Sequence, residues 1–357
     1  MALPITIAGV MSGTSMDGLD IAICRFEEHT ARWSFELIAA HTIAYSEQWQ
    51  TRLSNAYNAT GVELASLHAD FGNFIGKSVK EFCEQKNLQP DFISSHGHTI
   101  FHQPDKHFTL QLGCGANIAA TSGIDTICDF RTTDVAHGGQ GAPLVPVGDA
   151  HLFGGHRFCL NLGGIANISF DKNDKRLAFD ICPANMVLNY LAQQTGKSFD
   201  RDGIIAAEGS VVPELLERLN SLSFYKKSPP RSLGREFFET EFLPAIEDER
   251  YNISDRLRTV TEHIGIQIAN TLFHAPGTTM LTTGGGAYNN LLVEVIEEQV
   301  SRHGIHVIVP DQEIVEFKEA IIFAFLGALR IREIPNALAS VTGADVDSIG
   351  GAIYKSA

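Results

Sequence analysis

The chain begins with two short apolar runs that flank a turn of small, hydroxylated and acidic residues. Residues 7–10 and 19–23 form the apolar runs, and residues 11–18 connect them. Two strands joined by such a turn form a hairpin whose tip presents backbone N–H groups and hydroxyls outward. The pattern therefore predicts a β-hairpin at this point.

The tip of this hairpin carries residue types that suit phosphate binding. Gly13 and Gly18 let the backbone approach a bulky anion, and Thr14 and Ser15 add hydroxyl donors. Asp17 fits beside a phosphate only if a divalent cation or its waters lie between the two. The alternative is an ordinary hairpin turn that contains an aspartate, and the motif alone does not decide between them.

The rest of the chain alternates between strand and helix patterns, which is typical of an α/β fold. The clearest helix is residues 61–85, whose apolar residues recur every three or four positions. Residues 33–44 predict a third strand beside the hairpin. The other predicted helices are residues 48–56, 116–121, 184–194, 254–274, 289–303 and 312–330, and the other predicted strands include residues 91–95, 107–112, 125–129, 177–180, 278–282 and 306–309.

A second hairpin pattern spans residues 158–170, with Gly163 and Gly164 in its turn. A strand and a helix follow it, as in the first half, so we expect a duplicated fold with a cleft between two lobes. The two phosphate-compatible tips would then face each other across that cleft. A third glycine cluster, residues 284–286, follows a strand and precedes a helix, where the backbone can approach a nucleotide closely.

Residues 131–146 are rich in glycine and lack an apolar period, which is typical of an interdomain or site loop. A chain of 357 residues is long enough for two domains, since one core rarely grows beyond about 250–300 residues. We therefore expect one domain to comprise residues 1–130 and 340–357, and the other to comprise residues 131–339.

Composition narrows the class of protein. Hydrophobic residues make up 44% and charged residues 19%, as in soluble globular chains, and the net charge of −15 argues against nucleic acid or an anionic membrane as the main partner. The six cysteines show no C-x-x-C pairing, so buried thiols in a reducing compartment are expected. We find no signal-peptide pattern and no apolar stretch of transmembrane length, so we expect a cytoplasmic protein.

Two further patterns resemble known sites but fall short of them. Residues 72–78 and 195–198 resemble P-loops, yet each lacks part of the motif and neither follows a strand, so no P-loop is predicted. The histidines of residues 96–107 allow a zinc site, but nothing resembles an H-E-x-x-H helix. Polar pocket lining or hydrogen-bonded loop histidines are the favoured interpretation.

Two carboxylates are candidates for catalysis. Asp180 ends the strand pattern of residues 177–180 and precedes a turn into a helix, a place where α/β enzymes carry a general base. The alternative for Asp180 is a helix N-cap. Glu319 lies among apolar residues of a helix and would point into the cleft, or alternatively would be an exposed first-turn glutamate favoured by the helix dipole.

Several long motifs together resemble those of the anhydro-N-acetylmuramic acid kinases. The opening segment, residues 9–20, has the pattern G-x-M-S-G-T-S-M-D-G-L-D, which resembles the opening signature of that family. Other segments agree in the same order along nearly the whole chain. They are residues 95–104, 129–131, 134–146, 161–168, 229–236 and 283–289, and the stretch from Glu319 onward.

The resemblance implies a two-lobed fold of the actin, Hsp70 and sugar-kinase superfamily, in which each lobe is a ribonuclease-H-like mixed sheet flanked by helices and the active site lies in the cleft. It implies an ATP-dependent kinase that opens 1,6-anhydro-N-acetylmuramic acid with water and phosphorylates O6. The products would be N-acetylmuramic acid 6-phosphate and ADP, in peptidoglycan recycling. ATP, Mg²⁺ and the sugar are the expected cofactors and partners; neither nucleic acid nor a membrane is expected, and a homodimer stays open.

The resemblance also assigns roles to residues. Asp180 would deprotonate the attacking water, and Glu319 would orient or tune Asp180. Asp17 would hold Mg²⁺ through water, and Arg131 would pair with the lactyl carboxylate of the sugar. The expected sugar-binding residues are His98, Thr99, Arg131 and Asn185, and the expected ATP-binding residues are Ser12, Gly13, Thr14, Ser15, Asp17, Gly18, Gly163, Gly164, Gly284, Gly285 and Gly286.

One segment departs from the family pattern. The commoner pattern after the catalytic aspartate is Thr-Gly-Pro-Gly-Asn, whereas residues 181–185 are Ile-Cys-Pro-Ala-Asn. We expect the activity to survive, with a different backbone approach to the sugar. Two other classes stay open: another ATP-dependent sugar kinase of the same fold, in which Asp180 would deprotonate a sugar hydroxyl, and a non-catalytic nucleotide- or sugar-binding module.

Overall fold

The computed structural model describes residues 3–13, 16–30, 32–229 and 231–357, with Arg235 described by its backbone alone. Contacts within the chain divide it into two compact units. The first unit comprises Met1–Leu152 and Phe317–Ala357, and the second comprises Phe153–Glu316. Residues 131–152 and 317–339 therefore group with the first unit, whereas the sequence pattern assigned them to the second domain.

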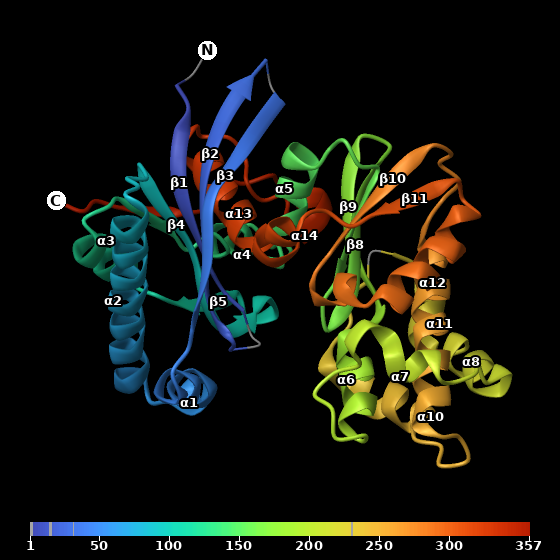
Figure 1. The fold of residues 1–357 in the computed structure, drawn as a ribbon. Helices are drawn as coiled ribbons and strands as arrows, with labels where there is room; N and C mark the ends of the chain where they lie inside the picture. The colour runs from blue at the N-terminus through green and yellow to red at the C-terminus, as the bar shows by residue number, and fades with distance from the viewer. Residues whose placement is uncertain (1–2, 14–15, 31, 230) are drawn as a thin grey trace. The chain divides into compact units, whose positions relative to one another are not determined.

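The first unit is built on a mixed sheet. Its described strands are β1 (Ile5–Ser12), β2 (Gly18–His29), β3 (Arg32–Ala44), β4 (Phe92–Gln103), β5 (Phe108–Leu112), β6 (Thr126–Cys128) and β12 (Ala352–Tyr354). They follow the order β12-β6-β4-β1-β2-β3, with β5 beside β4 (Figure 1). β1, β2 and β3 form an antiparallel meander, while β4 runs parallel to β1 and β6 runs parallel to β4. The predicted N-terminal hairpin and its third strand are confirmed.

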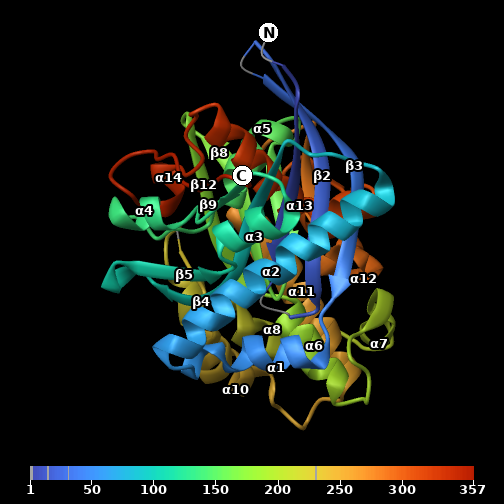
Figure 2. The same cartoon turned by 90° about the vertical axis from the view of Figure 1, so that its left-hand side faces the viewer.

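Helices cover both faces of this sheet (Figures 1 and 2). The helices of this part of the chain are α1 (Glu47–Asn55), η1 (Ala56–Asn58), α2 (Gly61–Lys86), η2 (Pro104–Lys106), α3 (Gly115–Ser122), α4 (Thr132–Ala136), α5 (Val145–Leu152), α13 (Gln312–Ile331) and α14 (Ala339–Thr342). Successive residues of a strand point to opposite faces. Ala8 and Val10 of β1 accordingly share a core with Phe71 and Ile75 of α2, whereas Gly9 faces α13.

The longest helix of the first unit, α2, begins and ends at clear local signals. Thr60 and Glu63 form a capping box that satisfies the first backbone N–H groups. Asn87, with a left-handed φ of 54°, ends the helix. The predicted helix over residues 61–85 is confirmed to within one residue.

The C-terminal helix α13 packs unusually closely on β1. A Cβ atom at Gly9 would lie 1.9 Å from the carbonyl oxygen of Ala320. Further along α13, the Phe325 ring packs against Phe26, with centroids 5.5 Å apart, and against Trp33, at 5.2 Å. These contacts explain why α13 belongs to the first unit, although it lies far from β1 in the sequence.

The second unit repeats the same sheet. Its described strands are β7 (Phe158–Leu162), β8 (Ile165–Lys172), β9 (Lys175–Pro183), β10 (Thr278–Thr283) and β11 (Ile305–Ile308). They follow the order β11-β10-β7-β8-β9, in which β7, β8 and β9 are antiparallel and β10 and β11 continue in parallel. This order and these directions match β6-β4-β1-β2-β3 of the first unit. The duplication and the two ribonuclease-H-like mixed sheets are therefore confirmed.

Helices and a buried apolar core complete the second unit. Its helices are α6 (Asn185–Gln193), η3 (Arg201–Gly203), α7 (Ile204–Ala207), α8 (Pro213–Asn220), η4 (Ser223–Lys226), α9 (Arg235–Phe237), η5 (Phe238–Phe242), α10 (Leu243–Ile246), α11 (Ile253–Thr271), η6 (Gly285–Tyr288) and α12 (Asn290–Ser301). Leu257, Val260, Ile264 and Ile268 of α11 lie in this core at helical spacing. The predicted long helices over residues 254–274 and 289–303 are confirmed, with shorter ends.

Two expectations about local structure differ from the fold. The strand predicted over residues 91–95 continues to Gln103, because buried polar residues such as His96 and His98 extend it without an apolar signature. Residues 131–146 contain α4 and the start of α5 rather than a loop without order. The polar side chain of Asp134, fully buried within this stretch, accounts for the missing apolar period.

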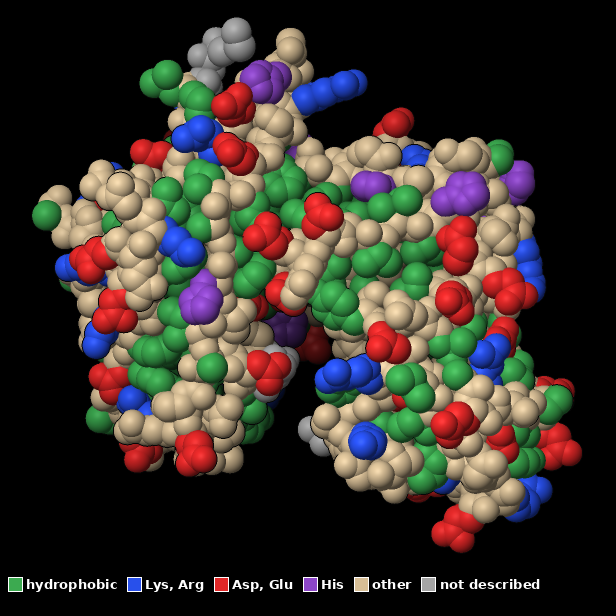
Figure 3. Space-filling view, viewed as in Figure 1, with side chains coloured by type: hydrophobic (Ala, Val, Ile, Leu, Met, Phe, Trp, Pro, Cys, Tyr) green, Lys and Arg blue, Asp and Glu red, His purple; other side chains and the backbone are tan. Residues whose placement is uncertain are grey.

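Surface charge and hydropathy agree with the composition. Asp and Glu side chains are scattered among Lys and Arg over the visible faces of both units (Figure 3), in keeping with the net charge of −15. Of the helices in the described ranges, none combines the length and apolar character that crossing a membrane would need.

The close contact at Gly9 predicts a large effect of a single methyl group. Gly9→Ala should lower the free energy of unfolding of the first unit by about 2–3 kcal/mol, because the added carbon forces β1 and α13 apart. Urea unfolding followed by circular dichroism measures this. The control is Gly61→Ala, at the start of α2, where a Cβ meets no atom within 4 Å. Equal stability of the two variants would contradict the prediction.

Candidate active site

Ser12, at the end of β1, is held by two buried side chains. Its Oγ accepts a hydrogen bond of 2.6 Å from the Tyr45 hydroxyl and lies 2.9 Å from Nδ1 of His98. Burial lowers the pKa of His98, so its ring is neutral near pH 7. The Ser12 hydroxyl is thus engaged within the protein by Tyr45 and His98.

The tip of the β1–β2 hairpin offers one exposed carboxylate. Asp17 is exposed, and its backbone carbonyl accepts a hydrogen bond from the Tyr45 N–H at 3.2 Å. A Cβ at Gly18 would lie 2.7 Å from the Ile43 carbonyl oxygen, so packing against β3 already requires this glycine. Gly13 is half-buried beside the tip. The predicted contacts from Thr14 and Ser15 fall outside the described residues.

Arg131 is fixed by the strand β4 and the segment after α4. Its Nε and Nη2 atoms lie 3.1 and 2.9 Å from Nε2 of His96, and its Nη1 donates to the Gly141 carbonyl at 2.6 Å. His96 Nδ1 lies 2.9 Å from the Gly97 carbonyl, so this nitrogen donates and Nε2 accepts from Arg131. The histidine therefore holds a guanidinium.

Charged groups near Arg131 and His96 influence the pKa of both residues. Burial lowers the pKa of Arg131 to about 10, and the negative charges of Glu319 and Asp134 oppose the fall. Burial, and then the charge of Arg131, hold the pKa of His96 well below its usual range. Arg131 remains a cation at neutral pH, and His96 is neutral. His96 was not predicted as a site residue; the H-x-H pattern on a strand was its only sequence signal.

Glu319 lies in α13 beyond its first turn, so the alternative of a first-turn glutamate is wrong. Its side chain reaches solvent, yet the surrounding protein raises the pKa of this carboxyl, while the charges of Arg131 and Lys318 oppose that rise. Next to it, Lys318 Nζ lies 2.7 Å from Oδ1 of Asp149 in α5. Both of these side chains are about 95% buried. The first unit therefore combines Arg131, His96 and Glu319 in one charged cluster.

In the second unit, two glycine-containing segments meet at Asn185. The Asn185 side-chain amide donates to the Leu162 carbonyl at 2.9 Å, and its backbone N–H donates to the Gly163 carbonyl at 3.1 Å. A Cβ at Gly286 would lie 3.0 Å from Oδ1 of Asn185, and one at Gly284 would clash with the backbone of Leu162. The predicted ATP-binding glycines of residues 163–164 and 284–286 thus lie together, with Asn185 as the link between them.

The half-buried Asp180 lies within β9, opposite Asn167 of β8. The N-cap position of α6 is Ala184, so the alternative role of Asp180 as a helix cap is wrong. Its Oδ2 accepts hydrogen bonds from the Leu233 N–H at 2.8 Å and from the Ser232 hydroxyl at 3.4 Å. Burial raises the pKa of Asp180, and these two donors lower it. Among the described residues no hydrogen bond to Oδ1 is found, so this oxygen is available to a ligand.

The departure from the family pattern at residues 181–185 lies inside the protein. Cys182 and Ala184 are both fully buried. Burial raises the pKa of the Cys182 thiol far above its usual range, so it is a neutral packing group. Replacing glycine at these two positions therefore changes the core beside β9 and not the solvent-facing surface around Asp180.

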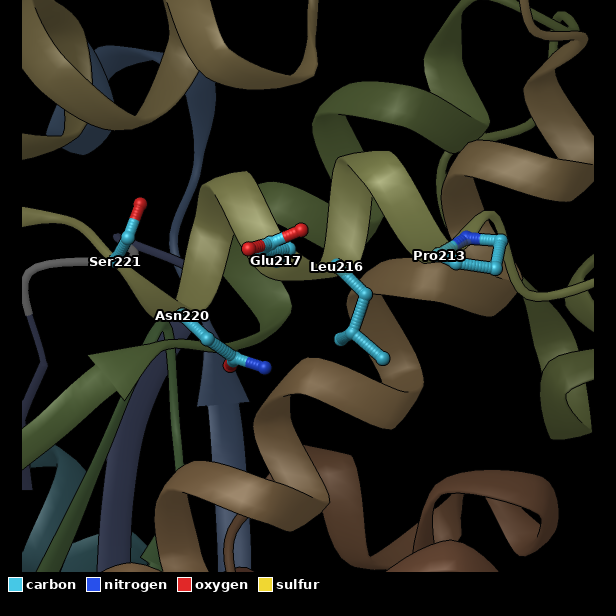
Figure 4. Close-up of a pocket in the computed structure, with 5 residues that line it drawn as sticks. All are labelled: Pro213, Leu216, Glu217, Asn220 and Ser221. Atoms are coloured by element: carbon cyan, nitrogen blue, oxygen red, sulfur yellow. The ribbon is translucent and has the colours of Figure 1, made fainter.

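A shallow surface pocket also lies in the second unit. It has a volume of about 470 Å³ and is lined by residues of α8 and its C-terminal turn, among them Leu216, Glu217 and Asn220 (Figure 4). None of the predicted site residues lines it. The pocket therefore contains none of the predicted chemistry.

Two sheets of the same strand order, each opening with a glycine-tipped hairpin, define the duplicated ribonuclease-H-like fold of sugar kinases and actin-like ATPases. A family model described as anhydro-N-acetylmuramic acid kinase matches residues 5–356. A protein of that name from Bacillus cereus (strain Q1) is 35% identical, covering 98% of this chain and 99% of its own. One from Bacillus thuringiensis (strain Al Hakam) is 34% identical, covering 97% of each. The chain belongs to the anhydro-N-acetylmuramic acid kinase family.

Solved structures with similar folds are more distant. Component A of (R)-2-hydroxyglutaryl-CoA dehydratase from Acidaminococcus fermentans is 14% identical, with a TM-score of 0.46 over 90% of this chain and 96% of its own. A ROK family glucokinase from Streptomyces griseus, in complex with glucose and AMPPNP, is 12% identical, with a TM-score of 0.41 over 90% of this chain and 98% of its own.

The buried pair beside Glu319 predicts a strong stability effect. Lys318→Met should lower the free energy of unfolding by about 3–5 kcal/mol, because it removes the cation that lies 2.7 Å from the buried Asp149 carboxylate. Thermal and urea unfolding measure the change. Lys77→Met, which removes one partner of an exposed pair with Glu81, is the control and should leave stability unchanged. A Lys318 variant as stable as this control would contradict the prediction.

Proposed function

We propose that this protein is an ATP-dependent kinase that opens 1,6-anhydro-N-acetylmuramic acid with water and phosphorylates O6. The products are N-acetylmuramic acid 6-phosphate and ADP. Membership of the anhydro-N-acetylmuramic acid kinase family supports this substrate. The observation that carries the mechanism is Asp180, whose Oδ2 is fixed by two donors while Oδ1 stays available.

Asp180 acts as the general base. Its carboxylate takes a proton from a water molecule, whose oxygen attacks the anomeric carbon as the bond from that carbon to O6 breaks. O6 leaves with the electron pair of this bond and accepts the γ-phosphoryl group, while the bond from phosphorus to ADP breaks. Such transfer depends mainly on positioning and on neutralising charge.

The glycine segments bind ATP through the backbone. Gly163 and Gly164 at one hairpin tip, with residues 284–286 beside them, offer closely approachable backbone for the nucleotide. Gly13, half-buried next to Ser12, offers the equivalent surface in the first unit. Asp17, exposed beside that tip, suits a Mg²⁺ ion held through water, which would neutralise charge on the phosphates.

Four of the predicted residues carry groups that suit the sugar: His98, Thr99, Arg131 and Asn185. Arg131, a cation with its guanidinium held by His96, suits the lactyl carboxylate of the sugar. Thr99 is half-buried on the same strand as His98 and adds a hydroxyl. Asn185 holds the turn at Gly163 through its hydrogen bonds. A cytoplasmic role in peptidoglycan recycling fits this substrate. A homodimer remains part of the proposal.

Turnover in ¹⁸O-water tests the proposal. The protein is incubated with ATP, Mg²⁺ and the anhydro sugar, and the sugar product is analysed by mass spectrometry. A phosphorylated sugar with one heavy oxygen at the anomeric carbon is expected. A sugar phosphate without heavy oxygen would identify an ordinary sugar kinase, and no sugar phosphate despite ATP binding would overturn kinase activity on this sugar.

Replacing the general base separates catalysis from binding. Asp180→Asn should lower kcat at least about a hundredfold, because the amide accepts no proton from water. The dissociation constant for ATP, measured by calorimetry, should stay within about twofold because Asp180 makes no nucleotide contact in this mechanism. The exposed Asp105→Asn is the control and should keep full activity. Full turnover by the Asp180 variant would contradict the assigned role.

The raised pKa of Asp180 predicts the pH dependence of the reaction. A general base works only when ionised, so kcat/KM should fall as the pH drops through the raised pKa of this carboxyl. The fall should occur at a higher pH than for an unperturbed aspartate. Initial rates measured between about pH 4 and pH 8, with circular dichroism to confirm folding, test this. A profile that stays flat down to the ordinary aspartate range would contradict it.

A further inference from the structure

A segment after η4 is joined by two hydrogen bonds to the backbone of Asp180 in β9. The Asp180 N–H donates to the Arg231 carbonyl at 3.0 Å. In return, Nε of the Arg231 side chain donates to the Asp180 carbonyl at 3.3 Å. The segment of residues 231–233 therefore lies along the edge of β9 at the position of the proposed base.

The same segment also holds the carboxylate. The Leu233 N–H and the Ser232 hydroxyl both donate to Oδ2, at 2.8 and 3.4 Å. Two donors on one oxygen fix the rotation of the carboxylate about its last bond. In the proposed mechanism Oδ1 is then the oxygen that takes the proton from water.

We infer that Ser232 and Arg231 are positioning residues for Asp180: Ser232 orients its carboxylate and Arg231 holds the segment against β9. This inference rests on the proposed role of Asp180 as general base. Neither residue reacts, and no bond to either one forms or breaks.

Arg231 is well built for this task because it gathers several backbone carbonyls. Its Nη1 donates to the carbonyls of Phe224, Tyr225 and Lys227, at 3.4, 3.5 and 3.1 Å. Its guanidinium also lies over the Phe224 ring, with Cζ 4.6 Å from the ring centroid. One side chain thus ties η4 to β9.

A buried polar chain fixes η4 in turn. The Tyr225 hydroxyl lies 2.9 Å from Nε2 of His263 in α11, and Nδ1 of that ring lies 2.7 Å from Oδ1 of Asn220. Gln267 donates to the same Asn220 oxygen at 2.8 Å. Burial lowers the pKa of His263 to about 3, so this chain keeps one protonation state across the working pH range.

The ionisable groups around Asp180 within the second unit are few. Burial raises the pKa of both Tyr225 and Cys182 above its usual range, so both groups are neutral. Arg231 is positive, but the atom of Asp180 to which it donates is the backbone oxygen. The hydrogen bonds from Ser232 and Leu233 are thus the interactions that lower the pKa of this carboxyl against the effect of burial.

The test compares four variants of the full-length protein. Ser232→Ala removes the hydroxyl, Ser232→Thr retains one, and Arg231→Gln removes the charge and most of the guanidinium contacts. Ser228→Ala, at an exposed serine between η4 and Arg231, is the control. Each is measured by steady-state kinetics over a range of pH. The Asp180 carboxyl is also titrated by ¹³C NMR, with Asp180→Asn used to assign its signal.

Ser232→Ala should lower kcat about tenfold with KM within about twofold, because it disturbs the base and not substrate binding. The acid limb of kcat/KM and the NMR titration of Asp180 should both move to higher pH, since a donor to the ionised form is lost. Ser232→Thr should restore both readouts, and Arg231→Gln should lower kcat about a hundredfold. Ser228→Ala should match the unmodified protein.

An unchanged kcat, acid limb and Asp180 titration in Ser232→Ala would overturn the inference, while leaving the proposed reaction intact if the unmodified protein makes the labelled sugar phosphate. If the unmodified protein makes none, the proposed function fails. The NMR titration then still decides whether Ser232 acts on Asp180: an unmoved titration overturns the inference, and a shift to higher pH supports it.

Discussion

The close approach of β1 and α13 at Gly9 organises the first unit. Backbone atoms of the two elements come so near that even a methyl group does not fit between them. This contact fixes where α13 lies on the sheet, and with it the position of Glu319 relative to Arg131 and His96. A charged cluster of this kind keeps its geometry only on a rigid support, because each buried charge is costly if its partner moves.

In the second unit, Asp180 is held in place by hydrogen bonds from the segment of residues 231–233. Asp180, the proposed base, lies on β9, which is the last strand of the described sheet order. The segment containing Ser232 fills that edge with backbone and hydroxyl donors, and Arg231 secures the segment. The same sheet therefore serves two tasks: in the first unit it supports charge, and in the second it supports a base and glycine-rich backbone.

Much of the fold follows from hydrophobic periodicity, since the hairpins, the long helices and the duplication all leave local patterns. The predictions failed where burial is polar. His96 and His98 extend β4 without apolar residues, and Asp134 lies buried inside a stretch that resembles a loop. Asp180 and Glu319 were singled out from sequence, but the contact of Ser232 with Asp180 was not, because residues far apart in sequence meet there through backbone geometry. Ser12 was singled out from sequence as an ATP-binding residue, but its hydroxyl is engaged by His98 and Tyr45.

The way in which α13 completes the first unit also bears on synthesis of the chain. A ribosome releases β1 to β6 long before α13, and the whole second unit emerges in between. Until α13 arrives, the face of β1 around Gly9 and the Phe26 ring lack their apolar cover. Domains tend to fold as they emerge, and uncovered sheet surface invites aggregation. The second unit, continuous in sequence, is therefore the one able to fold first, and the nascent N-terminal sheet is the part of this protein that most needs a chaperone.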